Sequence, residues 1–289
     1  MQARGSPRRR LWLWPAILLV AALTASAGGE PSDRRIASAD TWPRVVYPSP
    51  TAVRRARSFA AARGDVSFAV LGGSAGIRGY AVSHPFSSAS ASKALLLAAA
   101  LRLHEREKER LDSDTRALLE SMITYSDNRA AGGIYADVGD AGLERVAERA
   151  GMREFEVAPG FWGGAQITAA DMSRFYFRLE RNLGRRHRDY GLRLLAGITP
   201  SQRWGIPAAA DRSWRIWFKG GWRPSGQEGT TGPVTHQAAL LEHRDGERLA
   251  IAVLSDEVPG AGAGFDAIEG IAGRLLAKPP PRRSGWVAP

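Results

Sequence analysis

Strand-like segments stand at both ends of this chain, and a long helical stretch separates them. "VSFAVL" (Val66–Leu71) and "IRGYAVS" (Ile77–Ser83) are rich in β-branched and aromatic residues, and the glycine-rich "GGSAG" joins them. Because short turns join neighbouring strands of this kind, the sheet should be antiparallel. Three further strands are predicted towards the other end: Trp214–Lys219, Thr235–His243 and Arg248–Asp256.

Helical patterns surround these strands. One helix should begin at Ser49 or Thr51 and run to about Ala62, and another should span Gly264–Ala277. Residues 90–195 are almost entirely helical in pattern, and the capping box Thr168-Ala-Ala-Asp171 should open a helix that reaches about Leu183.

We therefore predict an α/β (α+β) fold with one five-stranded antiparallel sheet flanked by the terminal helices. An all-helical lobe, of about residues 84–210, should be inserted between the two parts of the sheet. Clefts between lobes are common positions for binding sites, so we expect an active site at this seam.

The first 27 residues have the pattern of a secretory signal peptide. Residues 1–10 carry four arginines and no acid, an apolar run spans Leu11–Leu23, and Ala25-Ser-Ala27 offers small residues for cleavage. The run is short for a membrane span, so an uncleaved anchor is the less favoured alternative. The arginines also hint weakly at twin-arginine export. We expect a secreted or extracytoplasmic protein without a stable membrane span after cleavage.

The remaining chain should hold one domain. We expect a flexible segment over 28–50, the domain over 51–277 and a proline-rich tail over 278–289. An apolar content of 44% and a charged content of 24% in 289 residues are typical of a globular protein with a core. The chain has no cysteine, so core packing must stabilise the fold without disulfides.

The chain is basic, but its charges are scattered. The formal net charge is +11, and removing the four leader arginines leaves +7. No basic stripe with interleaved aromatic residues is present in the sequence, so we do not expect a nucleic-acid partner. The five histidines also lack metal-ligand spacing, and we expect no metal or cofactor: His84, His104, His187, His236 and His243.

Three short motifs occur in order along the chain. "SASK" (Ser90–Lys93) begins a helical stretch, "SDN" (Ser126–Asn128) lies between two helical stretches, and "KGG" (Lys219–Gly221) ends a strand. Each has a plain structural reading, since Ser, Asp and Asn favour helix N-caps and a polar strand end often enters a turn. Their order and contexts instead favour a catalytic set, S-x-x-K, then S-D-N, then K-x-G.

With these motifs the chain resembles the class A serine β-lactamase family, within the wider group of penicillin-recognising serine hydrolases, over roughly Val66–Leu276. The segments "SDN", "SQRWGI" (Ser201–Ile206) and "FKGGW" (Phe218–Trp222) are similar to an actinobacterial branch of class A β-lactamase-related serine hydrolases. The resemblance implies a β-lactamase/transpeptidase-like fold and a serine that forms an acyl-enzyme.

The resemblance also implies a role for each motif residue. Ser90 would be the nucleophile and Lys93 its base, while Ser126 would relay a proton to the leaving nitrogen. Asn128 would hold Lys93 and bind the substrate's side-chain amide. The backbone N–H groups of Ser90 and Trp222 would form the oxyanion hole. The other substrate-binding positions would be Lys219, Gly220, Gly221, Trp222 and His236.

The carboxyl-terminal motif carries two more specific expectations. Gly221 should let the substrate backbone approach the strand closely. Gly220 stands where the family pattern K-T-G has threonine, which removes a hydroxyl that would help bind the substrate carboxylate. His236 would compensate, or it would face solvent as an ordinary strand residue.

Two further departures concern the rest of the site. Ser90 and Ser126 are only 36 residues apart, so the usual insertion with its aromatic wall is missing and the cleft should be more open. The family's E-x-x-L-N loop motif, whose glutamate activates the hydrolytic water, is also absent. Only Glu154 and Glu156 lie between residues 151 and 168, and neither is followed by Leu-Asn. Acylation is therefore better supported than deacylation.

We predict a monomeric serine hydrolase that forms a seryl acyl-enzyme with β-lactams or related amides and hydrolyses it slowly. Two alternatives stay open: a D,D-peptidase or amidase acting on cell-wall peptides, and a non-enzymatic penicillin-binding envelope protein. A rival nucleophile motif, G-x-S-x-G over Gly72–Gly76, requires a following helix. A strand is predicted there instead, so we interpret this segment as a hairpin turn.

Overall fold

The structure is a computed structural model that describes residues 47–73, 75–224, 233–256, 258 and 262–277. The chain divides into two units, Met1–Arg44 and Val45–Pro289, and every described residue lies in the second. The predicted signal peptide, most of the segment 28–50 and the proline-rich tail lie outside the described residues. Among the helices that are described, none has the length and apolar character needed to cross a membrane.

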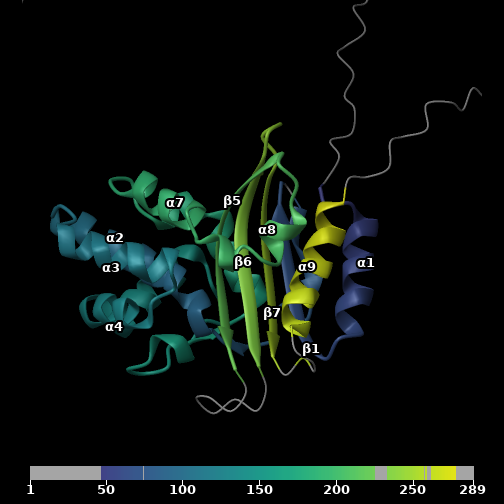
Figure 1. Ribbon diagram of the computed structural model, residues 1–289, viewed down its shortest axis with the longest axis horizontal. Helices are drawn as coiled ribbons and strands as arrows, with labels where there is room; N and C mark the ends of the chain where they lie inside the picture. Colours follow the sequence, from purple (N-terminus) through teal and green to yellow (C-terminus); the bar gives the residue numbers. More distant parts are fainter. Residues whose placement is uncertain (1–46, 74, 225–232, 257, 259–261, 278–289) are drawn as a thin grey trace, which may run out of the picture. The chain divides into compact units, whose positions relative to one another are not determined.

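A five-stranded antiparallel sheet runs through the middle of the domain, in the order β2-β1-β7-β6-β5 (Figure 1). β7 pairs with both β1 and β6, which joins strands from the two ends of the chain in one sheet. The fold prediction is therefore confirmed, and β5 stands at an edge of the sheet. The strands are β1 (Asp65–Gly72), β2 (Ala75–Tyr80), β5 (Trp214–Arg223), β6 (Val234–His243) and β7 (Arg248–Asp256).

Two strand ends differ from their predicted positions. β2 ends at Tyr80 and not at Ser83, because Ala81 adopts a φ of 45°, a left-handed conformation that breaks an extended strand. β5 continues beyond Lys219 to Arg223, because its glycines remain paired with β6. The K-G-G motif therefore lies inside an edge strand and not at its end.

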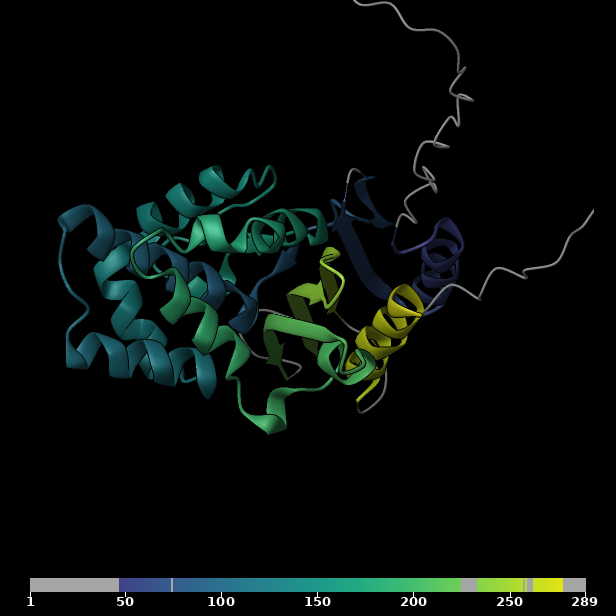
Figure 2. The same ribbon diagram turned by 90° about the horizontal axis from the view of Figure 1, so that it is seen from above.

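Helices α1 (Pro50–Ala61) and α9 (Ala263–Leu276) pack against each other and against one face of the sheet. Figures 1 and 2 show this purple and yellow pair on the side of the sheet opposite to the helical lobe. Ser49 caps α1 by accepting a hydrogen bond from the Ala52 backbone N–H at 3.2 Å. The apolar stripe of α9 covers the sheet through Ile268, Ile271 and Leu275.

The helical lobe has α2 as its buried centre. Leu95, Leu96, Leu97 and Leu101 are all fully buried, as expected for a helix that is apolar on every side. The prediction of a helical middle is confirmed. The helices of this part are α2 (Lys93–Glu107), α3 (Ser113–Thr124), α4 (Asn128–Ala150), α5 (Ala169–Phe177), α6 (Leu179–Asn182), α7 (Arg188–Ala196) and α8 (Ile206–Ala209).

Several short elements of this region were not predicted. The helix expected from Thr168 to Leu183 is split into α5 and α6, because the backbone leaves the helical conformation at Arg178. A two-stranded ladder joins β3 (Phe86–Ser87) to β4 (Gln166–Ile167). Three 3₁₀ turns also occur, η1 (Ala89–Ser92), η2 (Trp162–Gly164) and η3 (Pro200–Gln202).

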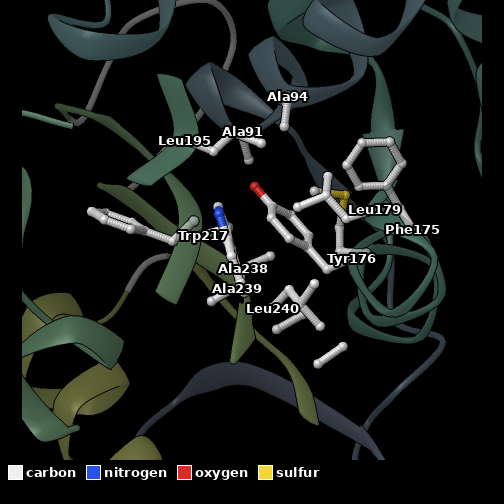
Figure 3. Packing of buried hydrophobic residues seen from close by; sticks show 14 of the residues in the cluster. Ala91, Ala94, Phe175, Tyr176, Leu179, Leu195, Trp217, Ala238, Ala239 and Leu240 are labelled. Atoms are coloured by element: carbon white, nitrogen blue, oxygen red, sulfur yellow. The ribbon is translucent and has the colours of Figure 1, made fainter. Parts of the chain in front are cut away.

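Helix α5 supports the segment that precedes α2. Figure 3 shows Tyr176 of α5 between Ala91 of η1 and Leu240 of β6. The small side chains of Ala91 and Ala94 are fully buried and leave room for this aromatic residue. Burial also raises the pKa of the Tyr176 hydroxyl, so the group stays neutral. The η1 turn thus rests on a rigid, closely packed core.

Candidate active site

The η1 turn presents Ser90 in front of α2, at the junction of the helical lobe and the sheet. The residue before it, Ala89, has a φ of 45°, a conformation that costs energy for a residue other than glycine. The Ser88 backbone N–H donates to the Ala165 carbonyl at 2.8 Å and holds the turn from outside. A strained backbone fixed by its surroundings is common at functional sites.

Of the two serines in "SASK", Ser90 is the one that a substrate could reach. Ser92 is fully buried, and its hydroxyl donates to the Ala89 carbonyl at 2.8 Å. Ser90 is partly exposed, and in the described part of the chain its hydroxyl has no hydrogen bond to Lys93. Ser90 lies in the η1 turn, which directly precedes Lys93 at the start of α2.

Lys93 is completely buried at the first position of α2. Its ammonium Nζ donates to Asn128 Oδ1 at 2.7 Å, to the Ser126 carbonyl at 2.5 Å and to Ser126 Oγ at 3.2 Å. Burial lowers the pKa of Lys93 to about 8, although the nearby Asp127 carboxylate opposes the shift. A lysine with this pKa is neutral in roughly one molecule in ten at pH 7 and can then accept a proton.

Ser126 lies in the short connection between α3 and α4 and is held in a left-handed conformation, with a φ of 62°. The following residue, Asp127, caps α4 by accepting from the Ala130 N–H at 2.8 Å, and its own N–H donates to the Ser121 carbonyl at 3.2 Å. The N-cap reading of "SDN" therefore applies to Asp127, while the side chains on either side of it point to Lys93.

Lys219 completes the centre from β5. Its Nζ donates to Ser126 Oγ at 3.1 Å and to the Gly220 carbonyl at 2.9 Å, with Gln202 Oε1 at 3.5 Å. Burial lowers the pKa of Lys219 to about 7, and the charge of Lys93 contributes to the decrease. The Ser126 hydroxyl therefore lies between two buried lysine amines, which come from the helical lobe and from the sheet.

Gly221 has a different role from the one that we predicted. A Cβ added to it would lie 2.9 Å from the Ser90 backbone nitrogen and 2.6 Å from that of Ala91. The missing side chain thus makes room for the η1 turn, while the close approach of a substrate stays a prediction. It also places the Ser90 backbone directly beside β5, near Trp222. The oxyanion pair formed by the Ser90 and Trp222 N–H groups stays a prediction.

An aromatic cluster fills the space next to Gly220. A Cβ at this glycine would lie 3.0 Å from the Trp204 ring, which packs edge-on against Phe265 at 4.5 Å and against Trp222 at 6.1 Å. A side chain at position 220 would therefore require the Trp204 ring to shift slightly. The exposed fraction of Trp222 is 42%, so one member of this cluster borders solvent beside the site. The sequence contained Trp204 in "SQRWGI" but did not indicate this contact.

His236 does not bind substrate in this arrangement, and the prediction that it compensates for the missing threonine is wrong. The ring is fully buried, Nε2 donates to the Ser87 carbonyl at 2.9 Å, and Nδ1 accepts from the Ser255 N–H at 3.2 Å. Burial lowers its pKa to about 4, so it stays neutral. The solvent-facing alternative is wrong as well. His236 instead ties β6 to the strand that leads into η1.

The two glutamates after α4 lie in a different network. Glu154 contacts Ser83 Oγ at 3.5 Å and Arg174 at 3.8 Å. The backbone of Glu156 pairs with Gln166. In the part of the chain that the structure describes, neither carboxylate bonds to Ser90, Lys93 or Ser126.

Asp171 explains why this loop turns away from the site. The capping hydrogen bond from the Asp171 N–H to Thr168 Oγ1 is present at 3.1 Å, as predicted. The buried Asp171 carboxylate, however, accepts from the Arg153 and Glu154 N–H groups at 2.7 and 2.9 Å and from Arg174 at 2.6 Å. These bonds fix residues 153 and 154 next to α5.

Trp162 is the residue of this loop that approaches the lysines. Its ring centroid lies 5.0 Å from Lys93 Nζ, within the range of a cation–π contact. Its carbonyl accepts from Ser88 Oγ at 3.4 Å, which attaches η2 to the turn that carries Ser90. The sequence offered no signal for this contact, because it depends on a loop conformation. The indole ring of Trp162 thus lies next to the Lys93 amine on the side that faces the loop.

A model of the beta-lactamase enzyme family matches residues 110–278. The matched region contains Ser126, Asn128 and Lys219, whereas Ser90 and Lys93 precede it. No curated protein matches the chain in sequence.

Solved structures share the fold. PBP-A has a TM-score of 0.66 and 16% identity over 78% of this chain and 95% of its own. A β-lactamase from Chitinophaga pinensis has a TM-score of 0.68 and 16% identity over 78% and 98%. A variant of the last common ancestor of Gram-negative bacteria beta-lactamase class A has a TM-score of 0.64 and 22% identity over 78% and 97%. At these identities the likeness shows the fold alone.

Proposed function

Because the chain belongs to the beta-lactamase enzyme family, we propose that it is a serine hydrolase whose Ser90 forms a covalent acyl-enzyme with β-lactams or related amides. One observation carries this proposal: the Ser126 hydroxyl lies within 3.2 Å of Lys93 Nζ and 3.1 Å of Lys219 Nζ, beside the turn that presents Ser90. Two buried lysines around one hydroxyl are costly for stability, and proton transfer gives them a chemical use.

Acylation would proceed by attack of Ser90 Oγ on the amide carbonyl carbon. Neutral Lys93 would take the hydroxyl proton, since burial brings its pKa close to the working pH. The proton would then pass through Ser126 to the amide nitrogen as the C–N bond breaks. The ester at Ser90 would remain with the acyl part, and the amine part would leave or stay tethered through its ring.

The two lysines have separate tasks in this scheme. The positive charge of Lys93 lowers the pKa of Lys219, so the pair favours a state in which one amine is neutral, and Lys219 also orients the Ser126 hydroxyl. Asn128 fixes the Lys93 amine through its carbonyl oxygen, and its amide group is left to meet a substrate. The Ser90 N–H and Trp222 N–H would stabilise the developing oxyanion.

Deacylation should be slow in this site. Hydrolysis of the ester needs a base that orients a water molecule, and such help contributes typically a hundred- to ten-thousand-fold. The described part of the chain brings no glutamate or aspartate side chain into hydrogen bonding with Lys93 or Lys219, and Trp162 covers Lys93 on the loop side. A Lys93 amine that is neutral after acylation would then be the remaining base to accept a proton from water.

The same observation favours a second candidate function, an amidase or D,D-peptidase acting on cell-wall peptides. Such an enzyme needs the acylation centre but tolerates a long-lived ester until an acceptor arrives. A purely non-enzymatic role would leave the complete lysine and serine arrangement without a purpose.

We further propose that the protein acts outside the cytoplasm after cleavage next to Ala27. Support comes from the basic, apolar and small-residue pattern of the first 27 residues. N-terminal sequencing of the exported protein should find a start near Gly28. An exported chain that retains residues 1–27 would refute cleavage.

Intact-mass analysis after exposure to benzylpenicillin tests the central proposal. The native chain should gain the mass of one penicillin molecule, and Ser90→Ala should gain none. Ser92→Ala is the matched control, because it removes the neighbouring buried hydroxyl and should still form the adduct. An adduct that persists in Ser90→Ala would refute Ser90 as the nucleophile.

A further inference from the structure

Four arginines line a hollow between α2 and α4, apart from the site described above. Arg102 and Arg106 come from α2, Arg145 and Arg149 come from α4, and the hollow has a volume of about 70 Å³. The two arginines of each helix are four residues apart, so they lie on one helix face. Two rows of positive charge therefore face each other, and none of the described residues that line the hollow is acidic.

The floor of this arginine hollow is small and apolar. Gly142 of α4 faces Ala99 of α2, since a Cβ at this position would lie 3.6 Å from the Ala99 Cβ, an ordinary van der Waals contact. Leu103, Val138 and Val146 complete the floor. Apolar residues cannot neutralise the guanidinium groups, although they support the aliphatic parts of the arginine side chains.

Most of the positive charge has no internal counter-ion. Arg102 is anchored, since it donates to Glu105 Oε2 at 3.3 Å and to the Asn182 carbonyl at 3.0 Å. Within the described ranges, Arg106, Arg145 and Arg149 form neither an ion pair nor a side-chain hydrogen bond. The glutamates that precede Arg145 and Arg149 in sequence do not line the hollow.

Such an arrangement weakens the fold on its own. Like charges four residues apart destabilise a helix, and here two such pairs face each other. Burial lowers the pKa of Arg102, and the positive charges of Arg149 and Arg181 add to the decrease, whereas Glu105 opposes it. A bound anion would remove this repulsion.

We propose that the arginine hollow binds a phosphate group. Guanidinium groups offer paired N–H donors that match phosphate oxygens, and several of them converge here. A volume of about 70 Å³ is small and suits a single phosphate group. A soluble phosphate compound and a phospholipid headgroup present this same chemistry.

Calorimetric titration of inorganic phosphate into the mature chain at low salt tests the proposal. Wild type should show saturable binding beyond that of chloride at equal ionic strength. Arg145→Gln/Arg149→Gln should weaken it by about tenfold or more. Arg54→Gln/Arg55→Gln removes the same charge from α1 and should change the dissociation constant by less than about twofold. Thermal unfolding without phosphate should find both double variants folded.

Sedimentation with phosphatidylglycerol vesicles distinguishes the two sources. Vesicle binding that Arg145→Gln/Arg149→Gln abolishes and that free phosphate displaces assigns a headgroup, whereas phosphate binding without vesicle binding assigns a soluble compound. Vesicles of phosphatidylcholine, which have no net charge, are the control. Absence of saturable phosphate binding to wild type, or equal weakening in Arg54→Gln/Arg55→Gln, would overturn the proposal.

Discussion

The two halves of the active site differ in how completely they are built. The acylation half consists of Ser90, Lys93, Ser126 and Lys219, and its two lysines are joined to Ser126 by hydrogen bonds of 2.5 to 3.2 Å. The loop over residues 151–168 instead brings an indole ring to Lys93 and directs its glutamates towards Arg174 and β4. We therefore expect that formation of the proposed acyl-enzyme and its hydrolysis can be changed separately.

The largest expected effect is on the acylation half. Lys93→Met removes the base and should lower the rate of penicillin acylation about a thousandfold, within the usual range for general-base catalysis. A time course of adduct mass measures this rate. Lys108→Met, in an exposed position after α2, should leave the rate unchanged. Equal acylation rates for Lys93→Met and wild type would show that Lys93 is not the base.

Two substitutions of Ser126 distinguish the effect of its hydroxyl on acylation from the effect of its strained backbone on stability. Both Ser126→Ala and Ser126→Gly lose the hydroxyl between the two lysines and should lower the acylation rate about a hundredfold. Ser126→Gly should nevertheless be about 1 kcal/mol more stable than Ser126→Ala, because a φ of 62° strains every residue except glycine. Urea unfolding of both variants measures the difference, and equal stabilities would argue against a strained Ser126.

A carboxylate introduced into the loop over residues 151–168 should speed hydrolysis of the acyl-enzyme. Trp162→Glu places a carboxylate where the indole approaches Lys93, and the deacylation rate should rise about tenfold as the new base orients water. Trp162→Gln has nearly the same shape without a basic group and serves as the control. Release of the adduct, followed by mass, gives the rate. An equal gain in both variants would show that removal of the ring, and not a base, controls hydrolysis.

The smallest effect is on stability as a function of pH. Lys93 and Lys219 have pKa values of about 8 and 7, below the value near 10.4 of an unfolded lysine. Between these limits the unfolded chain binds more protons than the native chain, so the free energy of unfolding should rise with pH. We expect an increase of about 1 kcal/mol from pH 7 to 8 in urea titrations. Lys93→Met/Lys219→Met should flatten the slope.

Spacing and order predicted the acylation half because its motifs are short and each lies within one local element. Ser90 lies in the η1 turn and Lys93 begins the helix that follows it. Ser126 and Asn128 lie on either side of Asp127, the N-cap of α4. The five-stranded sheet was predictable for the same reason, since each strand carries its own pattern. The strain at Ser126 had no signal in the sequence, because it arises from the bonds around Asp127.

Contacts between distant segments were the part that could not be predicted. The β3–β4 ladder pairs residues about eighty positions apart through only two residues on each side. The roles of Gly221 and His236 depend on how β5 and β6 pack against η1, and those of Trp162 and Trp204 depend on loop conformations. A motif identifies the chemical groups, whereas tertiary packing decides which of them face a substrate.

The most direct test of the account follows a chromogenic cephalosporin under excess substrate. Wild type should release a burst of product equal to the enzyme concentration and then turn over slowly, since the ester at Ser90 forms faster than water removes it. Ser90→Ala should show neither phase. Sustained rapid turnover by wild type without a burst would contradict the account, because the loop would then activate water as efficiently as the lysines activate Ser90.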